Sequence, residues 1–225
     1  MAYFLCLETS TTVCSVSLFN ETELLSVRET NNGYTHAENL HIYINEALND
    51  AAISADQLDA VCVGKGPGSY TGLRIGVSAA KGIAYALNIP LIGMNSLLNI
   101  AVGAINNSPI KDCVFVPMID ARRMEVYLSV FDSNGKELKE TTSFIINAES
   151  LMELHNNYKK IILLGDGAGK CVSLINDYAG MELLNNYMPS AKNMGNYCKE
   201  KYTKSEFENV AYFEPFYLKE FFSGK

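Results

Sequence analysis

The first hundred residues alternate between hydrophobic and polar positions in patterns that predict strands first and helices later. Apolar runs and strict alternation are typical of strands, whereas apolar residues three or four positions apart are typical of helices. Thr35 and Glu38 have the form of a capping box, which predicts where the first helix begins. The predicted elements are strands at 3–7, 13–19 and 23–30, a helix after Thr35, a strand at 60–63, a helix at 70–87, a strand at 91–93 and a helix at 96–105.

A polar cluster that contains proline, at 106–109, separates this half from a second one that begins in the same way. There the pattern predicts strands at 114–119, 124–131 and 140–146, a helix at 149–158, a strand at 161–164 and a helix at 170–178. The repeated plan predicts a duplicated ribonuclease-H-like α/β fold with mixed sheets. We therefore expect an N-terminal lobe at 1–106, a C-terminal lobe with a tail at 107–225, and a cleft between them.

The composition is that of a globular protein, with 225 residues of which 48% are hydrophobic and 19% charged. The net charge is −7, and residues 1–110 hold four Lys and Arg against nine acids, which argues against a duplex-binding surface in this half. The six cysteines form no CxxC pair, so we expect reduced, buried thiols with no disulfide and no metal site. The chain starts without a basic region or a long apolar run, which favours a cytoplasmic protein with no membrane segment.

A carboxylate and several hydroxyls lie together where the first strand turns into the second, at Glu8, Thr9, Ser10 and Thr11. Backbone N–H and side-chain O–H groups in such a turn can hold phosphate oxygens, and Glu8 can hold a hydrated cation. The alternative is a plain β-turn in which Ser and Thr bond their own backbone.

A glycine-rich connection at 64–76 joins a strand to a helix, where the free N–H groups of the first helical turn attract anions. Gly66, Gly68 and Ser69 are its candidate phosphate-binding residues. Lys65 precedes the glycines, so this is not a Walker loop. The alternative is that these residues only make a tight turn.

A third glycine-rich turn, at 165–169, follows the strand at 161–164. Because glycine lets a ring approach the backbone, Gly165, Asp166 and Gly167 are candidates for holding an adenine. The alternative is a simple connection between a strand and a helix.

Four small residues recur every four positions along the predicted helix at 70–87: Gly72, Gly76, Ala80 and Ala84. Each glycine costs a helix about 1 kcal/mol, a cost that is expected only where another group approaches closely. The neighbour of this stripe is either the chain's own structure or a helix of another subunit.

The histidines are not spaced as a metal site or as part of a catalytic triad; they are His36, His41 and His155. Asp120 is followed by Arg122 and Arg123, which we expect to neutralise it rather than leave it to bind Mg²⁺.

Four segments, in order along the chain, resemble the bacterial TsaB (YeaZ) family, formerly described as glycoprotease-like. They are LETS at 7–10, GPGSYTGLRIG at 66–76, DARRMEVY at 120–127 and EPFYL at 214–218. The similarity extends from about residue 3 to 218. It implies an ASKHA or actin-like fold with two ribonuclease-H-like lobes.

The resemblance also implies a role in forming N6-threonylcarbamoyladenosine in tRNAs that read ANN codons. In that family TsaB is the non-catalytic partner of its paralogue TsaD, and TsaE joins through the complex as an ATPase. TsaD carries a metal-binding His-x-x-x-His, whereas the corresponding residues 92–99 of this chain contain no histidine. We therefore expect neither transferase nor peptidase activity, and no required cofactor.

The resemblance further suggests that the first two long helices of one subunit pack on those of another. Ile42 and Tyr43 of the first helix, together with the stripe of small residues, are the candidate interface with TsaD, or with a second copy when the chain is alone. We expect contact with tRNA to be indirect and any binding of ATP or ADP to be weak. The alternative function is an actin-like ATPase or kinase with its nucleotide between the lobes, which would use Glu8 and Asp120 as metal-anchoring carboxylates.

Overall fold

The computed structural model describes residues 1–33, 35–107 and 110–219, which form two compact units. Among the described residues, the first unit holds those of 1–96 and 190–219, and the second holds those of 97–189. This division differs from the expected lobes at 1–106 and 107–225, because the end of the chain packs on the first unit. There the ring of Tyr202 lies 5.2 Å from that of Phe4, and the Glu208 N–H donates to the Leu91 carbonyl at 2.8 Å. Residues 108 and 109 of the expected boundary lie outside the described residues.

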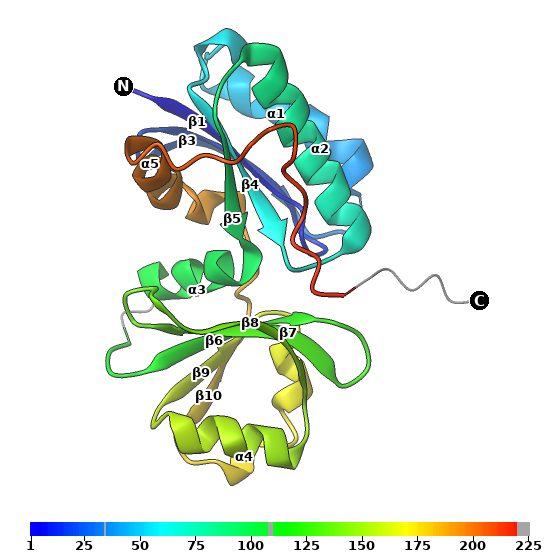
Figure 1. Cartoon of the computed structure of the whole chain (residues 1–225), viewed down its shortest axis with the longest axis vertical. Helices are drawn as coiled ribbons and strands as arrows, with labels where there is room; N and C mark the ends of the chain where they lie inside the picture. The colour runs from blue at the N-terminus through cyan, green and yellow to red at the C-terminus, as the bar shows by residue number, and fades with distance from the viewer. Residues whose placement is uncertain (34, 108–109, 220–225) are drawn as a thin grey trace, which may run out of the picture. The chain divides into compact units, whose positions relative to one another are not determined.

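The first unit is a five-stranded mixed sheet with helices on both faces (Figure 1). Its strands stand in the order β3-β2-β1-β4-β5, with β1 to β3 antiparallel and β4 and β5 parallel to β1. They are β1 Tyr3–Glu8, β2 Cys14–Asn20, β3 Glu23–Thr30, β4 Ala60–Gly66 and β5 Leu91–Asn95. The helices α1 His36–Asp50 and α2 Tyr70–Leu87 cover one face, and α5 Gly195–Thr203 packs on the other, with short turns η1 Ala55–Gln57 and η4 Ala191–Asn193 beside them.

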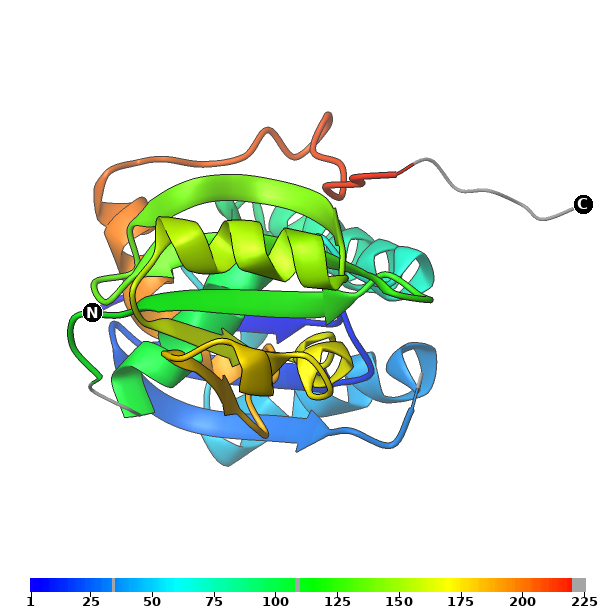
Figure 2. The same ribbon diagram turned by 90° about the horizontal axis from the view of Figure 1, so that it is seen from below.

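The second unit repeats the same strand order, β8-β7-β6-β9-β10. Again three antiparallel strands are followed by two strands parallel to the first of them, which confirms the predicted α/β duplication with mixed sheets. The strands are β6 Val114–Asp120, β7 Glu125–Asp132, β8 Glu137–Ile145, β9 Ile161–Leu164 and β10 Met181–Leu184. The sheet lies between α4 Ala148–Asn157 and α3 Ser96–Asn107 (Figures 1 and 2).

Two local predictions are wrong, and two elements are missed. Thr35 does not cap α1 with its hydroxyl, because Oγ1 accepts a hydrogen bond from the Asn39 side chain instead. The expected helix at 170–178 is replaced by two 3₁₀ turns, η2 Ala168–Cys171 and η3 Ile175–Asp177, in which backbone N–H groups bond to the third residue back. The pattern also misses β10 and α5. None of the described helices has the length and apolar character needed to cross a bilayer.

Candidate functional site

The predicted hairpin at Glu8 to Thr11 and the glycine-rich connection lie against each other at the carboxyl ends of β1 and β4. The Ser69 N–H donates to the Ser10 carbonyl at 2.6 Å, and Thr9 Oγ1 donates to the Gly72 carbonyl at 2.8 Å. Glu8, Thr9 and Ser10 are fully buried. The fold therefore joins the two phosphate-binding candidates of the first unit, but many of their polar atoms bond to one another.

The glycines of this connection are required by close contacts with other segments of the chain. A Cβ on Gly64 would overlap the Glu8 carboxylate, and one on Gly68 would overlap the Ser10 carbonyl. Gly66 has φ +109° and lies against the Phe216 carbonyl, which would be 2.8 Å from a Cβ. These close contacts favour the tight-turn alternative for the connection.

Glu8 makes the site electrostatically unusual. Its carboxylate accepts a hydrogen bond from the Ser10 N–H at 2.7 Å, yet burial raises the pKa of Glu8 to about 7. A carboxyl with this pKa is partly protonated near neutral pH, so it carries less negative charge than an exposed glutamate. Phosphate binding at Glu8, Thr9, Ser10, Thr11, Gly66, Gly68 and Ser69 stays a prediction.

The glycine-rich turn of the second unit also packs on its own sheet. Gly165 has φ +94°, and a Cβ on it would overlap the Met118 carbonyl of β6. A Cβ on Gly167 would lie 2.7 Å from Val126 Cγ1 of β7. Asp166 accepts a hydrogen bond from the Asp120 N–H at 3.1 Å. The backbone at Gly165 and Gly167 thus contacts strands on the side where a Cβ would lie, and adenine binding at Gly165, Asp166 and Gly167 stays a prediction.

Asp120 is paired with a residue that the sequence did not indicate. Lys170 Nζ lies 2.6 Å from Asp120 Oδ1 and 2.7 Å from the Glu125 carbonyl oxygen, while Arg122 and Arg123 are exposed. The negative charge of Asp120 is therefore paired with a basic side chain, as expected, but this side chain is Lys170 rather than Arg122 or Arg123. The pairing works against use of this carboxylate as a metal anchor.

The stripe of small residues on α2 faces the interior of its own unit. Ala80 and Ala84 lie in the core beside Leu40 and Val63, and a Cβ on Gly72 or Gly76 would overlap Thr9. The prediction that the stripe meets a partner is therefore wrong for Gly72, Gly76, Ala80 and Ala84. The alternative is correct, because these residues pack against the chain's own structure. Tyr43 is half-buried against the same core, whereas Ile42 is 52% exposed.

A different face of α2 forms a groove with α1. The groove has a volume of 470 Å³ and is mostly apolar. Its lining residues are Ala37, His41, Ile75, Ser78, Ala79, Gly82 and Ile83. The sequence carries a signal for it, because Ile75, Ala79 and Ile83 repeat every four residues beside the stripe.

The histidines do not converge on a site. His36 is buried with Nε2 2.8 Å from the Thr11 carbonyl oxygen, whereas His41 is exposed at the groove. His155 Nε2 lies 2.9 Å from the Ala179 carbonyl oxygen in the second unit.

Comparison with known proteins places these features in a family context. Residues 31–165 match the family described as "TsaD: tRNA N6-adenosine threonylcarbamoyltransferase". The chain is similar to the tRNA threonylcarbamoyladenosine biosynthesis protein TsaB of Haemophilus influenzae, with 36% identity over 56% of this chain and 52% of that protein. TsaB of Escherichia coli is 31% identical over 66% of this chain and 64% of that protein. TsaB of Bacillus subtilis is 29% identical over 78% of this chain and 76% of that protein. The chain thus aligns with about half of the Haemophilus protein's length.

Solved structures show the same architecture. YeaZ from Pseudomonas aeruginosa superposes with a TM-score of 0.81 at 25% identity, covering 97% of this chain and all of that one. A component of a 2-hydroxyglutaryl-CoA dehydratase from Acidaminococcus fermentans, with a TM-score of 0.53 and 11% identity, shares the fold alone. These likenesses agree with the expected actin-like class of two-lobed folds.

Proposed function

The chain belongs to the TsaB (YeaZ) family of tRNA threonylcarbamoyladenosine biosynthesis proteins, and from this membership we propose that it is the non-catalytic partner of TsaD. Its role is in the formation of N6-threonylcarbamoyladenosine in tRNA. The partner's task is to keep TsaD in a competent state, while TsaD transfers the threonylcarbamoyl group.

The observation that carries this proposal is the chemistry of residues 92–99, where the family resemblance places TsaD's metal-binding histidines. This chain has none there. Ser96 instead is buried, and its hydroxyl accepts a hydrogen bond from the Gly66 N–H at 3.2 Å. A hydroxyl used in this way does not polarise an acyl carbonyl as a metal ion would.

Reconstitution of tRNA modification from purified components tests the proposal. We expect no product from this chain without TsaD, and a strong increase when the chain is added to TsaD, TsaE and the enzyme that forms the adenylate. Full modification by those components with this chain omitted would contradict the role of required partner.

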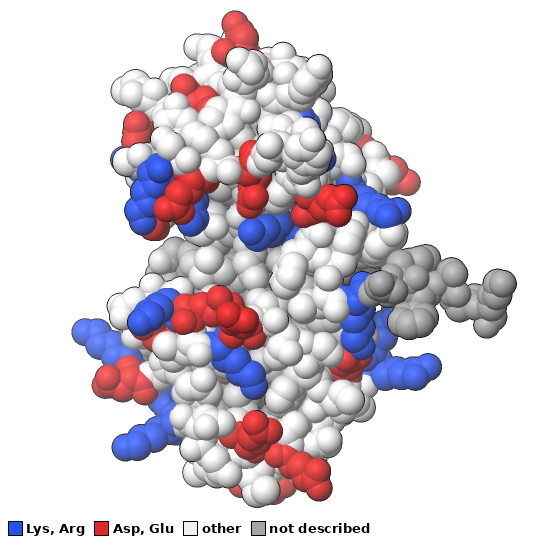
Figure 3. All heavy atoms as spheres, viewed as in Figure 1, with Lys and Arg blue, Asp and Glu red and all other residues white. Residues whose placement is uncertain are grey.

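The groove between α1 and α2 is the surface that we assign to TsaD, and to a second copy when the chain is alone. It is mostly apolar, and the exposed Ile42 follows its lining residue His41 on α1. Apolar surface of this kind is favourable to bury against a partner helix. TsaE then joins through TsaD, tRNA is contacted indirectly, and the complex acts in the cytoplasm. On the face seen in Figure 3, acidic and basic side chains are interspersed within each unit, so this face has no continuous basic surface for a phosphate backbone.

Gly82→Arg tests this surface without disturbing the core, because no atom lies within 4 Å of a Cβ at Gly82. We expect this variant to melt no lower than the parent, because arginine favours a helix over glycine, and to lose both self-association and co-purification with TsaD. Gly169→Arg is the matched control, since a Cβ there also meets open space, in the second unit. A Gly82→Arg protein that binds TsaD as tightly as the Gly169→Arg protein would rule out the groove.

The alternative function as an ATPase or kinase is tested with Mg-ATP. The pairing of Asp120 with Lys170 disfavours it, because a neutralised carboxylate binds Mg²⁺ poorly. Turnover that is proportional to protein and abolished by Glu8→Ala would support this alternative and contradict a purely non-catalytic role.

A further inference from the structure

Three cysteines that are far apart in the sequence meet in the interior of the first unit. The Sγ atoms of Cys6, Cys62 and Cys198 all lie within 4.8 Å of one another, and the three residues are fully buried. They come from β1, β4 and α5, which are three separate segments of the chain. Because the cysteines are scattered along the sequence, the sequence predicts no metal site. The fold, however, brings three of them together.

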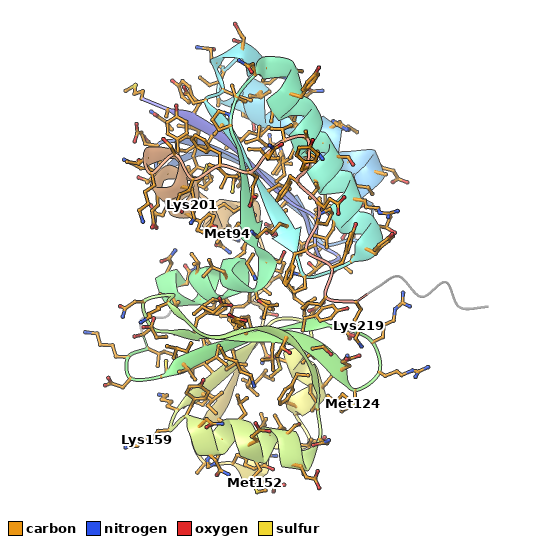
Figure 4. All side chains as sticks on the ribbon, viewed as in Figure 1. Met94, Met124, Met152, Lys159, Lys201 and Lys219 are labelled. Carbon is orange, nitrogen blue, oxygen red and sulfur yellow. The ribbon has the colours of Figure 1, made fainter. Side chains whose placement is uncertain are left out.

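Sheet geometry explains why the sulfurs converge. Leu5 and Leu7 point to the core beneath α1 and α2, so Cys6 between them points to the opposite face. Cys62 pairs with Cys6 in register on the neighbouring strand and points the same way. Cys198 reaches this face from α5, which packs on β1 and β5. Met94 of β5, labelled in Figure 4, is also fully buried. It pairs with Gly64, which lies two residues after Cys62 on β4 and therefore on the same face of the sheet.

The other three cysteines form a natural contrast. Cys14, Cys113 and Cys171 each lie in a different hydrophobic cluster, where a single thiol serves as a small apolar side chain. Cys6, Cys62 and Cys198 belong to none of these clusters and turn their sulfurs toward one another.

A hydroxyl group lies at the edge of the sulfur cluster. Ser17 pairs with Cys6 across the antiparallel β1–β2 ladder, so both side chains point to the same face of the sheet. Its Oγ is buried and makes no hydrogen bond of standard geometry to a described residue. The hydroxyl neighbours the Cys6 thiol, and it can turn to a bound ion once that thiol has lost its proton.

We propose that Cys6, Cys62 and Cys198 bind one thiophilic d¹⁰ metal ion, Zn²⁺ or Cu⁺, between the first sheet and α5. Sulfur ligands select such ions over Mg²⁺ or Ca²⁺. With metal–sulfur bonds of about 2.3 Å, sulfurs in a trigonal or tetrahedral site stand about 3.8–4.0 Å apart, so the cluster must contract by less than about 1 Å. Cu⁺ is satisfied by the three sulfurs, whereas Zn²⁺ would add Ser17 Oγ.

Binding is a proton-for-metal exchange. Each S–H group that forms a bond to the metal releases its proton to solvent, and no electron is transferred, so no oxidant is needed. The bound ion would tie α5, near the end of the chain, to β1 and β4 at its beginning. It would thereby stabilise the first unit independently of any role beside TsaD.

The test uses the full-length reduced protein, refolded in the presence of Zn²⁺ in one arm and Cu⁺ in the other, because the buried site needs an open state for metal entry. After desalting, we expect elemental analysis to find one metal ion per chain and the melting temperature to rise above that of the metal-free protein. Co²⁺ serves as a spectroscopic probe, and we expect a cobalt–thiolate charge-transfer band.

The variants Cys62→Ala and Cys198→Ala should weaken metal binding by about 100-fold or more and abolish the cobalt–thiolate band. Cys113→Ala is the matched control and should bind as the parent does. Circular dichroism of each metal-free variant establishes first that it is folded. Two results would overturn the proposal: refolded parent protein that retains neither ion, or a triple variant of Cys6, Cys62 and Cys198 that retains as much metal as the parent.

Discussion

Thr9 shows how one buried side chain sets the identity of residues far along the chain. Its Oγ1 donates to the Gly72 carbonyl, and its carbonyl and hydroxyl oxygens fill the space that a Cβ on Gly72 or Gly76 would need. The two glycines on α2 are thus explained by a residue more than sixty positions earlier, rather than by flexibility of the helix.

Gly76→Ala should destabilise the protein by about 1–3 kcal/mol, because the new methyl group overlaps Thr9 Oγ1. Gly82→Ala on the same helix is the control. A Cβ there meets nothing within 4 Å, so the gain in helix propensity should stabilise the protein by up to about 1 kcal/mol. Urea denaturation measures both changes.

A Thr9→Ala background separates crowding from other causes of this effect. With Oγ1 removed, Gly76→Ala should cost less than it does in the parent. Equal costs in the two backgrounds would show that crowding by Thr9 is not the reason.

His36 should make stability depend on pH. Burial lowers the pKa of its imidazole, while in the unfolded chain the pKa of His36 is about 6.5. The folded state then binds fewer protons than the unfolded state, so the stabilisation is complete above about pH 6.5 and is lost as the pH falls through the folded-state pKa. We expect His36→Gln to lose less stability than the parent between about pH 7.5 and about pH 5.5.

Denaturation at both pH values measures the effect as a difference between the two proteins. Glu8 titrates in both of them, so its contribution cancels. The same loss of stability in parent and variant would show that His36 does not cause it.

At the scale of elements, α2 is fixed at both ends by single residues. Ser69 Oγ accepts a hydrogen bond from the Gly72 N–H at 3.2 Å, and Asn88 ends the helix in the left-handed conformation with φ 53°. Between these ends, the inner face of the helix packs on the core and another face forms the groove with α1.

Ser69→Ala should lower the free energy of unfolding by about 1 kcal/mol through loss of this cap. Ser78→Ala is a matched control, because Ser78 is exposed in the middle of α2 and alanine favours a helix interior by a few tenths of a kcal/mol. Thermal or urea unfolding of the two variants compares them. A loss that is as large for Ser78→Ala would mean that the cap is not the cause.

At the scale of the whole molecule, the first unit is completed by residues from the end of the chain. Tyr202 packs on Phe4, Glu208 pairs with Lys65 at 3.3 Å, and Lys81 Nζ donates to the Phe213 carbonyl at 2.8 Å. The second unit is one continuous segment with its own core. Stability of the two units should therefore respond differently to truncation.

A chain that ends at Pro189 should lose protection from hydrogen exchange in β1 and β4, because the face that α5 covers becomes exposed. The amides of β6 and β9 in the second unit should stay protected. Exchange measured by mass spectrometry in the full chain provides the reference. Parent-like protection of β1 in the truncated chain would show that α5 and the segment after it do not complete the first unit.

Periodic apolar patterns determined most of the elements from sequence alone. The helix at 70–87 was predicted with the bounds that α2 has, and the shared plan of the two halves indicated a duplication that the strand orders confirm. Four short motifs likewise indicated the TsaB family from the sequence alone. Such signals are local, because the period of a helix or a strand is written in neighbouring residues.

Only the tertiary structure decided which residues face one another. The orientation of the stripe on α2, the pairing of Lys170 with Asp120 and the meeting of Cys198 with Cys6 and Cys62 join segments that are far apart in the sequence. The weakly patterned end of the chain is a further case, because α5 is a polar, short helix that is placed by its contacts with β1 and β5. Strand register and the choice of sheet face fix these contacts, and neither is encoded in the period of a single segment.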